Sequence, residues 1–291
     1  MIRVRVPATS ANLGPGYDCL GLALNLYSTF ESSPCDRLII EGVSPQYQNE
    51  DNLFVKAFRA AGGTGGLHLR IHSQIPVSRG LGSSASFLVG GAMTAMIQNG
   101  TFSRKHLFEL CCLLEGHPDN AAPAVYGGLT ASLMKDGFCI TRSLPLADSL
   151  RFTVMIPGCR VETDAARNAL PDCVAHRAAS ENSARAVLMT QALAAGDIPL
   201  LKEAAKDCMH EPFRKPLIPE YERLAETVTQ DAEGAMVISG SGSACLFISR
   251  NWLSEQCEQN LKALPGGWEV RRLSVGSGAE AVQEAEWQEI I

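Results

Sequence analysis

A glycine- and serine-rich segment carries the residues of this chain that are best suited to chemistry. It runs from Pro76 to Ser86 as Pro-Val-Ser-Arg-Gly-Leu-Gly-Ser-Ser-Ala-Ser, and it leads into an apolar stretch with helical spacing over 87–97. Glycines let a backbone turn tightly and approach a ligand closely. The helix that follows directs its free N–H groups and its positive dipole end at the turn. With serine hydroxyls as further donors or as ligands for Mg²⁺, the segment predicts a phosphate-binding loop.

Two familiar phosphate motifs do not fit this segment. No Gly-Lys-Ser/Thr closes it, as a Walker A loop requires, and its glycines do not match the Gly-x-Gly-x-x-Gly pattern of dinucleotide-binding folds. A purely structural turn and helix cap is the alternative. The three serine hydroxyls at 83, 84 and 86 and the preceding Pro76 favour a binding loop.

The surrounding patterns predict an α+β protein with two domains. Strand patterns fall at 1–7, 22–30, 37–42, 67–74, 129–133, 152–156, 235–239, 244–249 and 268–274. Helical patterns fall at 52–61, 87–97, 103–114, 121–126, 162–170, 178–195, 197–209, 217–230 and 252–263. A seam at 143–150 divides the chain into domains 1–149 and 150–291. Four strands with helices on one face predict an α+β sandwich in the second domain.

The composition limits the class of protein. The chain has 291 residues, 46% hydrophobic and 19% charged, with a net charge of −6, which is typical of a folded globular protein. Its basic residues are scattered, so nucleic-acid binding is disfavoured, and no apolar run is long enough to cross a bilayer. Ten cysteines without a C-x-x-C motif, and the lack of a signal-peptide pattern, indicate free thiols in a reducing cytoplasm.

Three motifs, taken together, resemble those of the GHMP kinase family. They are the loop 76–86, the segment 7–18 (Pro-Ala-Thr-Ser-Ala-Asn-Leu-Gly-Pro-Gly-Tyr-Asp) and the third glycine motif at 238–244, which contains Gly240, Ser241 and Gly242. Their order and the chain length also match, so the resemblance covers nearly the whole chain. It implies an N-terminal domain like the second domain of ribosomal protein S5 and a C-terminal ferredoxin-like α/β sandwich.

The resemblance also implies an activity and its partners. GHMP kinases transfer the γ-phosphoryl group of ATP, with Mg²⁺, to a small alcohol. The segment 7–18 is most similar to that of the members that phosphorylate L-homoserine in threonine biosynthesis, and these are often homodimers. L-Threonine or an isoprenoid precursor such as mevalonate is the alternative acceptor. A metabolite sensor that has kept the fold is a weaker alternative, because the phosphate loop is intact.

Residues are assigned to the two substrates and the metal by the same resemblance. ATP is assigned to Pro76, Val77, Ser78, Arg79, Gly80, Leu81, Gly82, Ser83, Ser84, Ala85 and Ser86, with Asn52 beside the purine. The acceptor is assigned to Asn12, Asp18, His117, Asn120, Arg167 and Arg214, and the transfer step to Asn120, Thr163 and Arg167. Mg²⁺ is assigned to Ser84 and to Glu109, which interrupts an apolar helical run before Glu115-Gly-His-Pro-Asp-Asn.

Each residue taken singly also has a structural interpretation. Glu109 fits a solvated helix face, Asn52 a helix cap, the arginines surface ion pairs, and Asn12 and Asp18 turn chemistry.

The reaction has two open routes at Asn120. Related kinases place an aspartate base where this chain has Asn120, and an amide cannot take a proton. The resemblance therefore implies transfer without a protein base. Asp119, which precedes Asn120, is the rival base.

Overall fold

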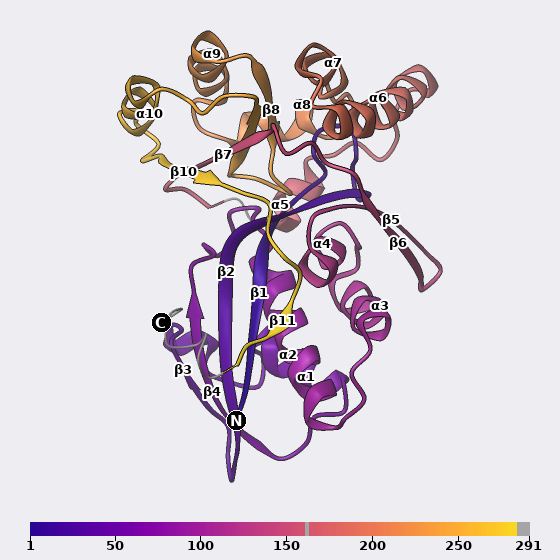
Figure 1. Cartoon of the computed structure of the whole chain (residues 1–291), viewed down its shortest axis with the longest axis vertical. Helices are drawn as coiled ribbons and strands as arrows, with labels where there is room; N and C mark the ends of the chain where they lie inside the picture. The colour runs from indigo at the N-terminus through magenta and orange to yellow at the C-terminus, as the bar shows by residue number, and fades with distance from the viewer. Residues whose placement is uncertain (161–162, 284–291) are drawn as a thin grey trace.

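The computed structural model describes residues 1–160 and 163–283. Figure 1 shows two sheets, one above the other, each covered by helices. The lower sheet is built mainly from the first half of the chain and the upper one from the second half. The α+β architecture predicted from the sequence is therefore confirmed.

The first sheet has seven strands among the described residues. They are β1 (Ile2–Ala11), β2 (Leu20–Cys35), β3 (Ile39–Glu41), β4 (Gly66–Ser73), β5 (Leu129–Lys135), β6 (Phe138–Leu144) and β11 (Glu280–Ala281). Their order is β11-β1-β2-β4-β3, and the β5–β6 hairpin pairs with the first residues of β2. The pairs are antiparallel except β3 with β4. The long β2 thus reaches from the lower sheet to the upper end of this domain.

The first strand passes through Pro7, where the sequence pattern predicted its end. The pairing register with β2 shifts between Pro7 and Ala8, so a bulge accommodates the proline. The strand then continues to Ala11, and the Thr9 N–H donates to the Leu81 carbonyl at 3.1 Å. This extension brings β1 into contact with the predicted phosphate loop.

The second sheet is antiparallel and has four strands in the part of the chain that is described. They are β7 (Arg151–Ile156), β8 (Gly234–Ile238), β9 (Cys245–Ser249) and β10 (Glu269–Leu273), in the order β10-β7-β9-β8. The chain then returns to the first sheet, where β11 pairs with β1 (Figure 1). The predicted division at 149/150 falls between β6 and β7, but the returning strand lies on the first sheet. The division itself stays a prediction.

Helices cover both sheets. Those of the first half are α1 (Leu53–Ala60), α2 (Ser83–Gln98), α3 (Arg104–Glu115) and α4 (Ala121–Tyr126), with a 3-10 helix at Pro45–Tyr47. Those of the second half are α5 (Thr163–Asn168), α6 (His176–Ala195), α7 (Ile198–Ala204), α8 (Glu211–Arg214), α9 (Tyr221–Asp231) and α10 (Glu255–Lys262), with a 3-10 helix at Lys215–Leu217. The patterns missed β6, β11 and α8, because two or four residues carry no readable periodicity and β6 is largely exposed.

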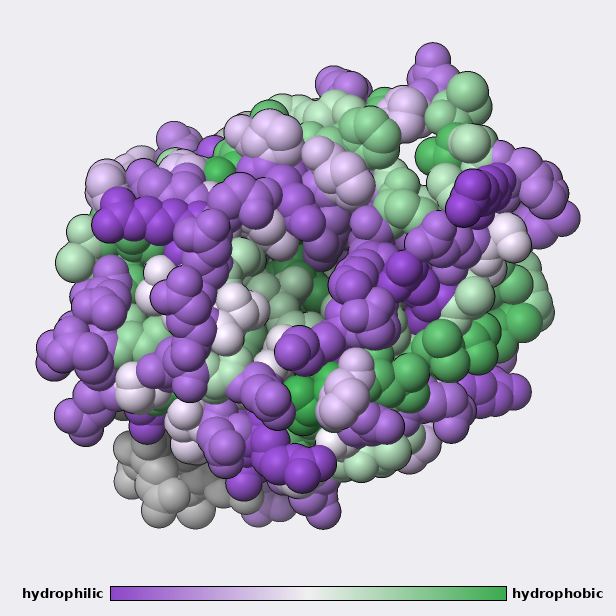
Figure 2. Space-filling model, turned by 90° about the horizontal axis from the view of Figure 1, so that it is seen from above, coloured by the Kyte–Doolittle hydropathy of each residue, from purple (hydrophilic) through white to green (hydrophobic). Residues whose placement is uncertain are grey.

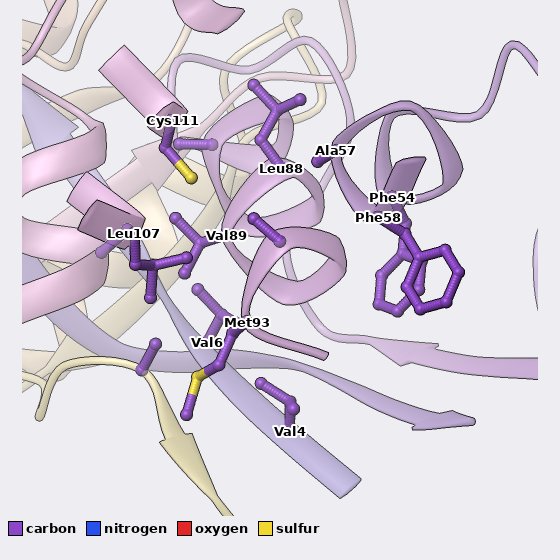
Figure 3. Close-up of a cluster of buried hydrophobic side chains, with 14 of the residues drawn as sticks. Val4, Val6, Phe54, Ala57, Phe58, Leu88, Val89, Met93, Leu107 and Cys111 are labelled. Carbon is purple, nitrogen blue, oxygen red and sulfur yellow. The ribbon is translucent and has the colours of Figure 1, made fainter. Parts of the chain in front are cut away.

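The helix α2 runs through the first core and fixes the loop that precedes it. Figure 3 shows Val89 and Met93 of α2 among side chains from β1, α1 and α3. Gly91 permits close contact, since a Cβ there would lie 2.0 Å from the Phe54 carbonyl oxygen. A helix held this tightly gives its N-terminus a fixed position.

The molecular surface differs from this core. Figure 2, a view from above, shows mostly hydrophilic residues with smaller hydrophobic patches between them. Within residues 1–160 and 163–283, no helix combines the length and apolar character that crossing a membrane would require.

Candidate active site

One cavity brings together most of the residues that the motifs singled out. It has a volume of about 540 Å³, which is suited to a small-molecule ligand. The first half of the chain contributes the loop 77–84 and residues from 115–120, and the second half contributes Arg167, Arg214 and the turn 240–241. The cavity therefore lies where the two halves of the chain meet.

The structure separates the predicted residues into two groups. Those that line the cavity are Asn12, Asp18, Asn52, Val77, Ser78, Arg79, Gly80, Gly82, Ser83, Ser84, His117, Asn120, Arg167, Arg214, Gly240 and Ser241. Those that do not are Pro76, Leu81, Ala85, Ser86, Glu109 and Gly242. Thr163 begins α5, but its side chain lies outside the described part of the structure. The ligand contacts assigned to these residues stay predictions.

The loop presents an uncapped helix N-terminus to the cavity. Gly80 and Gly82 have φ values of 72° and 66°, in the left-handed region that glycine adopts without strain. Gly82 is the N-cap of α2 and supplies no side-chain hydrogen bond. The first N–H groups of α2 therefore remain available, in the arrangement that binds phosphate oxygens.

The structure does not bring Glu109, which was assigned to the metal from the sequence, to the cavity. Glu109 lies on an outer face of α3, forms an i,i+4 ion pair with Lys105 at 2.6 Å and does not line the cavity. Glu115, at the end of the same helix, lines the cavity together with Ser84, whose hydroxyl favours the charged form of the Glu115 carboxyl and so acts to lower its pKa. Six residues separate the two glutamates, which is more than one and a half turns, so they lie on different faces of α3.

Glu115 is also in an unusual electrostatic state. Its Oε2 atom is buried and has no hydrogen-bond partner among the residues that the structure describes. Burial raises the pKa of the carboxyl to about 7, against the opposing effects of His117 and of the Ser84 hydroxyl. A buried carboxylate oxygen without a partner, beside a phosphate-type loop, is suited to a divalent cation.

The sequence did contain a signal for Glu115. It is the first residue of Glu115-Gly-His-Pro-Asp-Asn, which had already been singled out for the acceptor. The helix ends there, because Gly116 adopts a left-handed φ of 84° and its N–H donates to the Cys112 carbonyl. A carboxylate at the last turn of α3 is directed towards the cavity, whereas one in mid-helix need not be.

Charged groups meet on the acceptor side of the cavity. His117 Nδ1 lies 2.6 Å from Asp119 Oδ1, and Arg167 Nη2 lies 3.3 Å from Asp18 Oδ1. Burial lowers the pKa of His117, but the hydrogen bond and charge of Asp119 outweigh it and leave that pKa raised. Burial, with the charge of Asp119, raises the pKa of Asp18 even though Arg167 opposes the shift. A cation bound on this side would offset the repulsion between the Asp18 and Asp119 carboxylates.

Arg214 is held rigidly at the wall of the cavity. Its side chain is 2% exposed, and its Nε and Nη1 atoms donate to the carbonyls of Ala166 and Gly240, each at 3.2 Å. His210 Nδ1 lies 3.4 Å from Nη1, while His210 Nε2 lies 2.8 Å from the Gly14 carbonyl oxygen. Since that carbonyl needs a donor, His210 carries its proton on Nε2.

Two predicted residues act as structural links in addition to lining the cavity. Asn12 donates from Nδ2 to the Gly240 carbonyl at 2.9 Å and accepts the Asp18 N–H at 3.0 Å. Asn52 caps α1 by accepting the Phe54 N–H at 2.9 Å, as its alternative interpretation predicted. Neither contact requires a ligand, so both residues shape the cavity before anything binds.

The cavity wall near Asn52 differs chemically from the acceptor side. It includes apolar and aromatic side chains of Val43, Tyr47, Leu53, Val77 and Phe87. Such a surface suits a flat heterocycle. The cavity thus combines a hydrophobic wall, a phosphate-type turn and a cluster of charged groups.

Comparison with known proteins places this arrangement in one family. The model for the GHMP kinases N terminal domain matches residues 52–128, and that for the GHMP kinases C terminal domain matches residues 189–261. A homoserine kinase from Clostridium botulinum (strain Okra / Type B1) is 38% identical over 285 residues, covering 94% of this chain and 96% of the relative.

Solved structures agree with these sequence matches. The crystal structure of homoserine kinase from Cytophaga hutchinsonii has a TM-score of 0.82 at 26% identity and covers 97% of each chain. The mevalonate kinase of Methanococcus jannaschii has a TM-score of 0.70 at 16% identity, covering 94% of this chain and 98% of that one. The second likeness concerns the fold alone, and it matches the two-domain architecture predicted from the motifs.

Proposed function

Because this chain belongs to the GHMP kinase family and is 38% identical to a homoserine kinase over nearly its whole length, we propose that it phosphorylates L-homoserine. The reaction transfers the γ-phosphoryl group of ATP to the side-chain hydroxyl and gives O-phospho-L-homoserine, a step of threonine biosynthesis. One observation carries the proposal. A single cavity of about 540 Å³ joins a phosphate-type turn to side chains that complement an amino acid.

ATP binds in this proposal with its phosphates at the turn 80–84. The free N–H groups of α2 donate hydrogen bonds to the phosphate oxygens, and the adenine packs against the wall that contains Tyr47 and Phe87. The loop does not need to form on binding, because Gly80 and Gly82 already hold the required conformation. Pre-organisation of this kind reduces the entropic cost of binding.

Ser84 and Glu115 hold Mg²⁺ in this proposal, in place of the Ser84 and Glu109 pair. The fit depends on the buried, unpartnered Oε2 atom of Glu115 and on the adjacent Ser84 hydroxyl. Two protein ligands suffice, since Mg²⁺ usually keeps waters and phosphate oxygens. When bound, the ion neutralises charge on the phosphates.

The charged cluster binds the amino-acid part of the acceptor. Asp18 receives the ammonium group, because an ionised carboxylate only accepts hydrogen bonds, and Arg167 and Arg214 receive the carboxylate. Arg167 touches Asp18 and Tyr17 only at 3.3 and 3.4 Å, so a substrate carboxylate can replace these long contacts. Asn120 is left for the hydroxyl.

The structure supports transfer without a protein base. Asp119, the rival base, is 2% exposed and is engaged by His117 at 2.6 Å. In this route, positioning and charge neutralisation supply the catalysis. Asp119→Asn should then reduce acceptor binding more than kcat. A complete loss of kcat with acceptor binding intact, beside a mild Asn120→Ala, would identify Asp119 as the base.

A direct assay tests the acceptor. ATP- and Mg²⁺-dependent turnover should be compared for L-homoserine, L-threonine, L-serine and mevalonate, and we expect the highest kcat/KM for L-homoserine. A clear preference for L-threonine or mevalonate would overturn the substrate assignment while leaving the kinase assignment standing. Cytoplasmic location and a homodimeric state remain predictions, and cell fractionation and sedimentation test them.

A further inference from the structure

A buried threonine connects the phosphate loop with the asparagine at the acceptor. Thr9 is fully buried, and its hydroxyl lies 2.7 Å from Asn120 Oδ1. Its backbone N–H donates to the Leu81 carbonyl at 3.1 Å. Thr9 belongs to the part of β1 that continues beyond the Pro7 bulge. One residue of this strand therefore contacts both the loop and Asn120.

The glycine spacing of the loop makes room for this contact. A Cβ on Gly82 would lie 1.9 Å from Thr9 Oγ1 and 3.2 Å from Asn120 Oδ1. Any other residue at position 82 would therefore collide with the hydroxyl that reaches Asn120. Gly82 serves two purposes at once: it turns the backbone towards the ligand and leaves space for the Thr9–Asn120 hydrogen bond.

The hydrogen bond fixes the direction of the Asn120 amide. With Oδ1 towards Thr9, the Thr9 hydroxyl donates its proton, and within residues 1–160 and 163–283 it has no second partner. Turning the amide around would place Nδ2 against Thr9 and leave the buried hydroxyl proton without an acceptor. The Nδ2 group has no protein partner among the described residues, and Asn120 lines the cavity. Its N–H groups are therefore free for a ligand.

From this arrangement we infer that Thr9 is a positioning residue, which makes Asn120 a hydrogen-bond donor to the acceptor oxygen. The inference rests on the proposed kinase function and deepens it. An Asn120 N–H that donates to one lone pair of the acceptor oxygen orients another lone pair towards the γ-phosphorus. It does not remove the hydroxyl proton. The new O–P bond forms as the bond to ADP breaks, and the hydroxyl proton leaves with a phosphate oxygen or water.

A double-mutant cycle at Thr9 and Asn120 tests this coupling. Thr9→Val keeps the side-chain shape but removes the hydroxyl, and Thr9→Ser restores it. We expect Thr9→Val to lower kcat about ten- to hundredfold, with ATP affinity within about twofold, and Thr9→Ser to recover most of kcat. In the Asn120→Ala background, Thr9→Val should cause no further loss, because the group that it positions is gone.

A matched control separates positioning from loss of stability. Thr94 is also a buried threonine, but within the described part of the chain its hydroxyl has no hydrogen-bond partner, and it does not line the cavity. Thr94→Val should therefore leave kcat unchanged. If Thr9→Val fails to fold, Thr9→Ala compared with Thr9→Ser repeats the test with smaller side chains.

Three results would overturn the inference. They are a wild-type kcat in Thr9→Val, losses that add fully in the double mutant, or a parallel loss of ATP binding that points to the Leu81 contact instead. The cycle is measured with whichever acceptor alcohol gives turnover. A failure of L-homoserine as substrate would therefore count against the proposed function and leave this test intact.

Discussion

Two glycine-serine turns of similar composition serve different purposes in this molecule. The first, 80–84, leads into the helix α2 and leaves N–H groups free at its start. The second, 239–243, connects the antiparallel strands β8 and β9, and its N–H groups at 239, 240 and 242 donate to backbone carbonyls of the protein itself. The Gly240 N–H donates to Ala11, and the Gly240 carbonyl accepts from Asn12 and Arg214. A glycine turn that leads into a helix can thus bind a ligand, whereas one that joins two strands supports its neighbours.

The two turns also pack directly against each other. Ser239 Oγ donates to the Gly80 carbonyl at 2.7 Å, and a Cβ on Gly80 would lie 2.1 Å from the Ser239 carbonyl oxygen. The second turn therefore supports the first from the other half of the chain. The first turn and its neighbours carry the groups proposed to bind ATP, and the second turn holds the first in position.

The largest effect should come from the carboxylate beside the first turn. Glu115→Gln keeps the side-chain volume but weakens the proposed metal ligand, so kcat/KM should fall on the order of 10²- to 10³-fold. The melting temperature should stay the same or rise, because the substitution removes a charge whose burial destabilises the folded protein. Steady-state kinetics and thermal unfolding measure both. Full activity in Glu115→Gln would remove Glu115 from the site.

The next largest effect should come from the contact between the two turns. Gly80→Ala combines a φ of 72° with the collision at Ser239, and should lower the free energy of unfolding by about 2–4 kcal/mol. Gly65→Ala is the matched control, because Gly65 has a φ of 77° and no described atom lies within 4 Å of the added Cβ. It should cost about 1 kcal/mol. Equal losses in urea unfolding would show that the turns do not support each other.

A smaller effect is expected at the second turn. Arg214→Lys removes the planar group that bonds both Gly240 and Ala166. The KM for L-homoserine should rise about tenfold, with the affinity for ATP unchanged, since lysine cannot make the paired contacts. Kinetics and nucleotide titration separate the two. A loss of ATP affinity would mean that the second turn also serves the nucleotide.

The pH dependence of Mg²⁺ binding should sharpen the assignment at the first turn. The pKa of Glu115 is raised to about 7, so the carboxyl is protonated below that pH and must lose its proton to bind a cation. Apparent Mg²⁺ affinity should weaken about fivefold from pH 7 to pH 6 and level off above about pH 8. Calorimetry with a non-hydrolysable ATP analogue measures it. The Glu115→Gln variant should lack this step.

The smallest effect is predicted for the other glutamate of α3. Glu109 is paired with Lys105 outside the cavity, and exposed i,i+4 pairs contribute only a few tenths of a kcal/mol. Glu109→Gln should change kcat/KM by less than about twofold. A loss as large as that of Glu115→Gln would restore the assignment made from the sequence.

Individual residues show how far sequence reasoning reached. It predicted the α+β fold with two domains and the motifs whose residues line the cavity, because glycine spacing and residue chemistry are local properties. It selected Glu109 on α3, although Glu115 is the glutamate of that helix that lines the cavity, because a break in an apolar run marks a polar position but not the direction it faces. It ended β1 at Pro7, because a proline signals a strand end unless a bulge absorbs it.

The sequence by itself determined the turn chemistry, the caps and the family, since these depend on residue types a few positions apart. Only the tertiary structure decided that Glu115 faces Ser84, that the Gly240 carbonyl holds Arg214, and that Thr9 reaches Asn120 past Gly82. These contacts join residues separated by 26 to 111 positions or depend on a missing Cβ. Packing helices, strands and turns that lie far apart along the chain creates such contacts, and no local pattern encodes their distances.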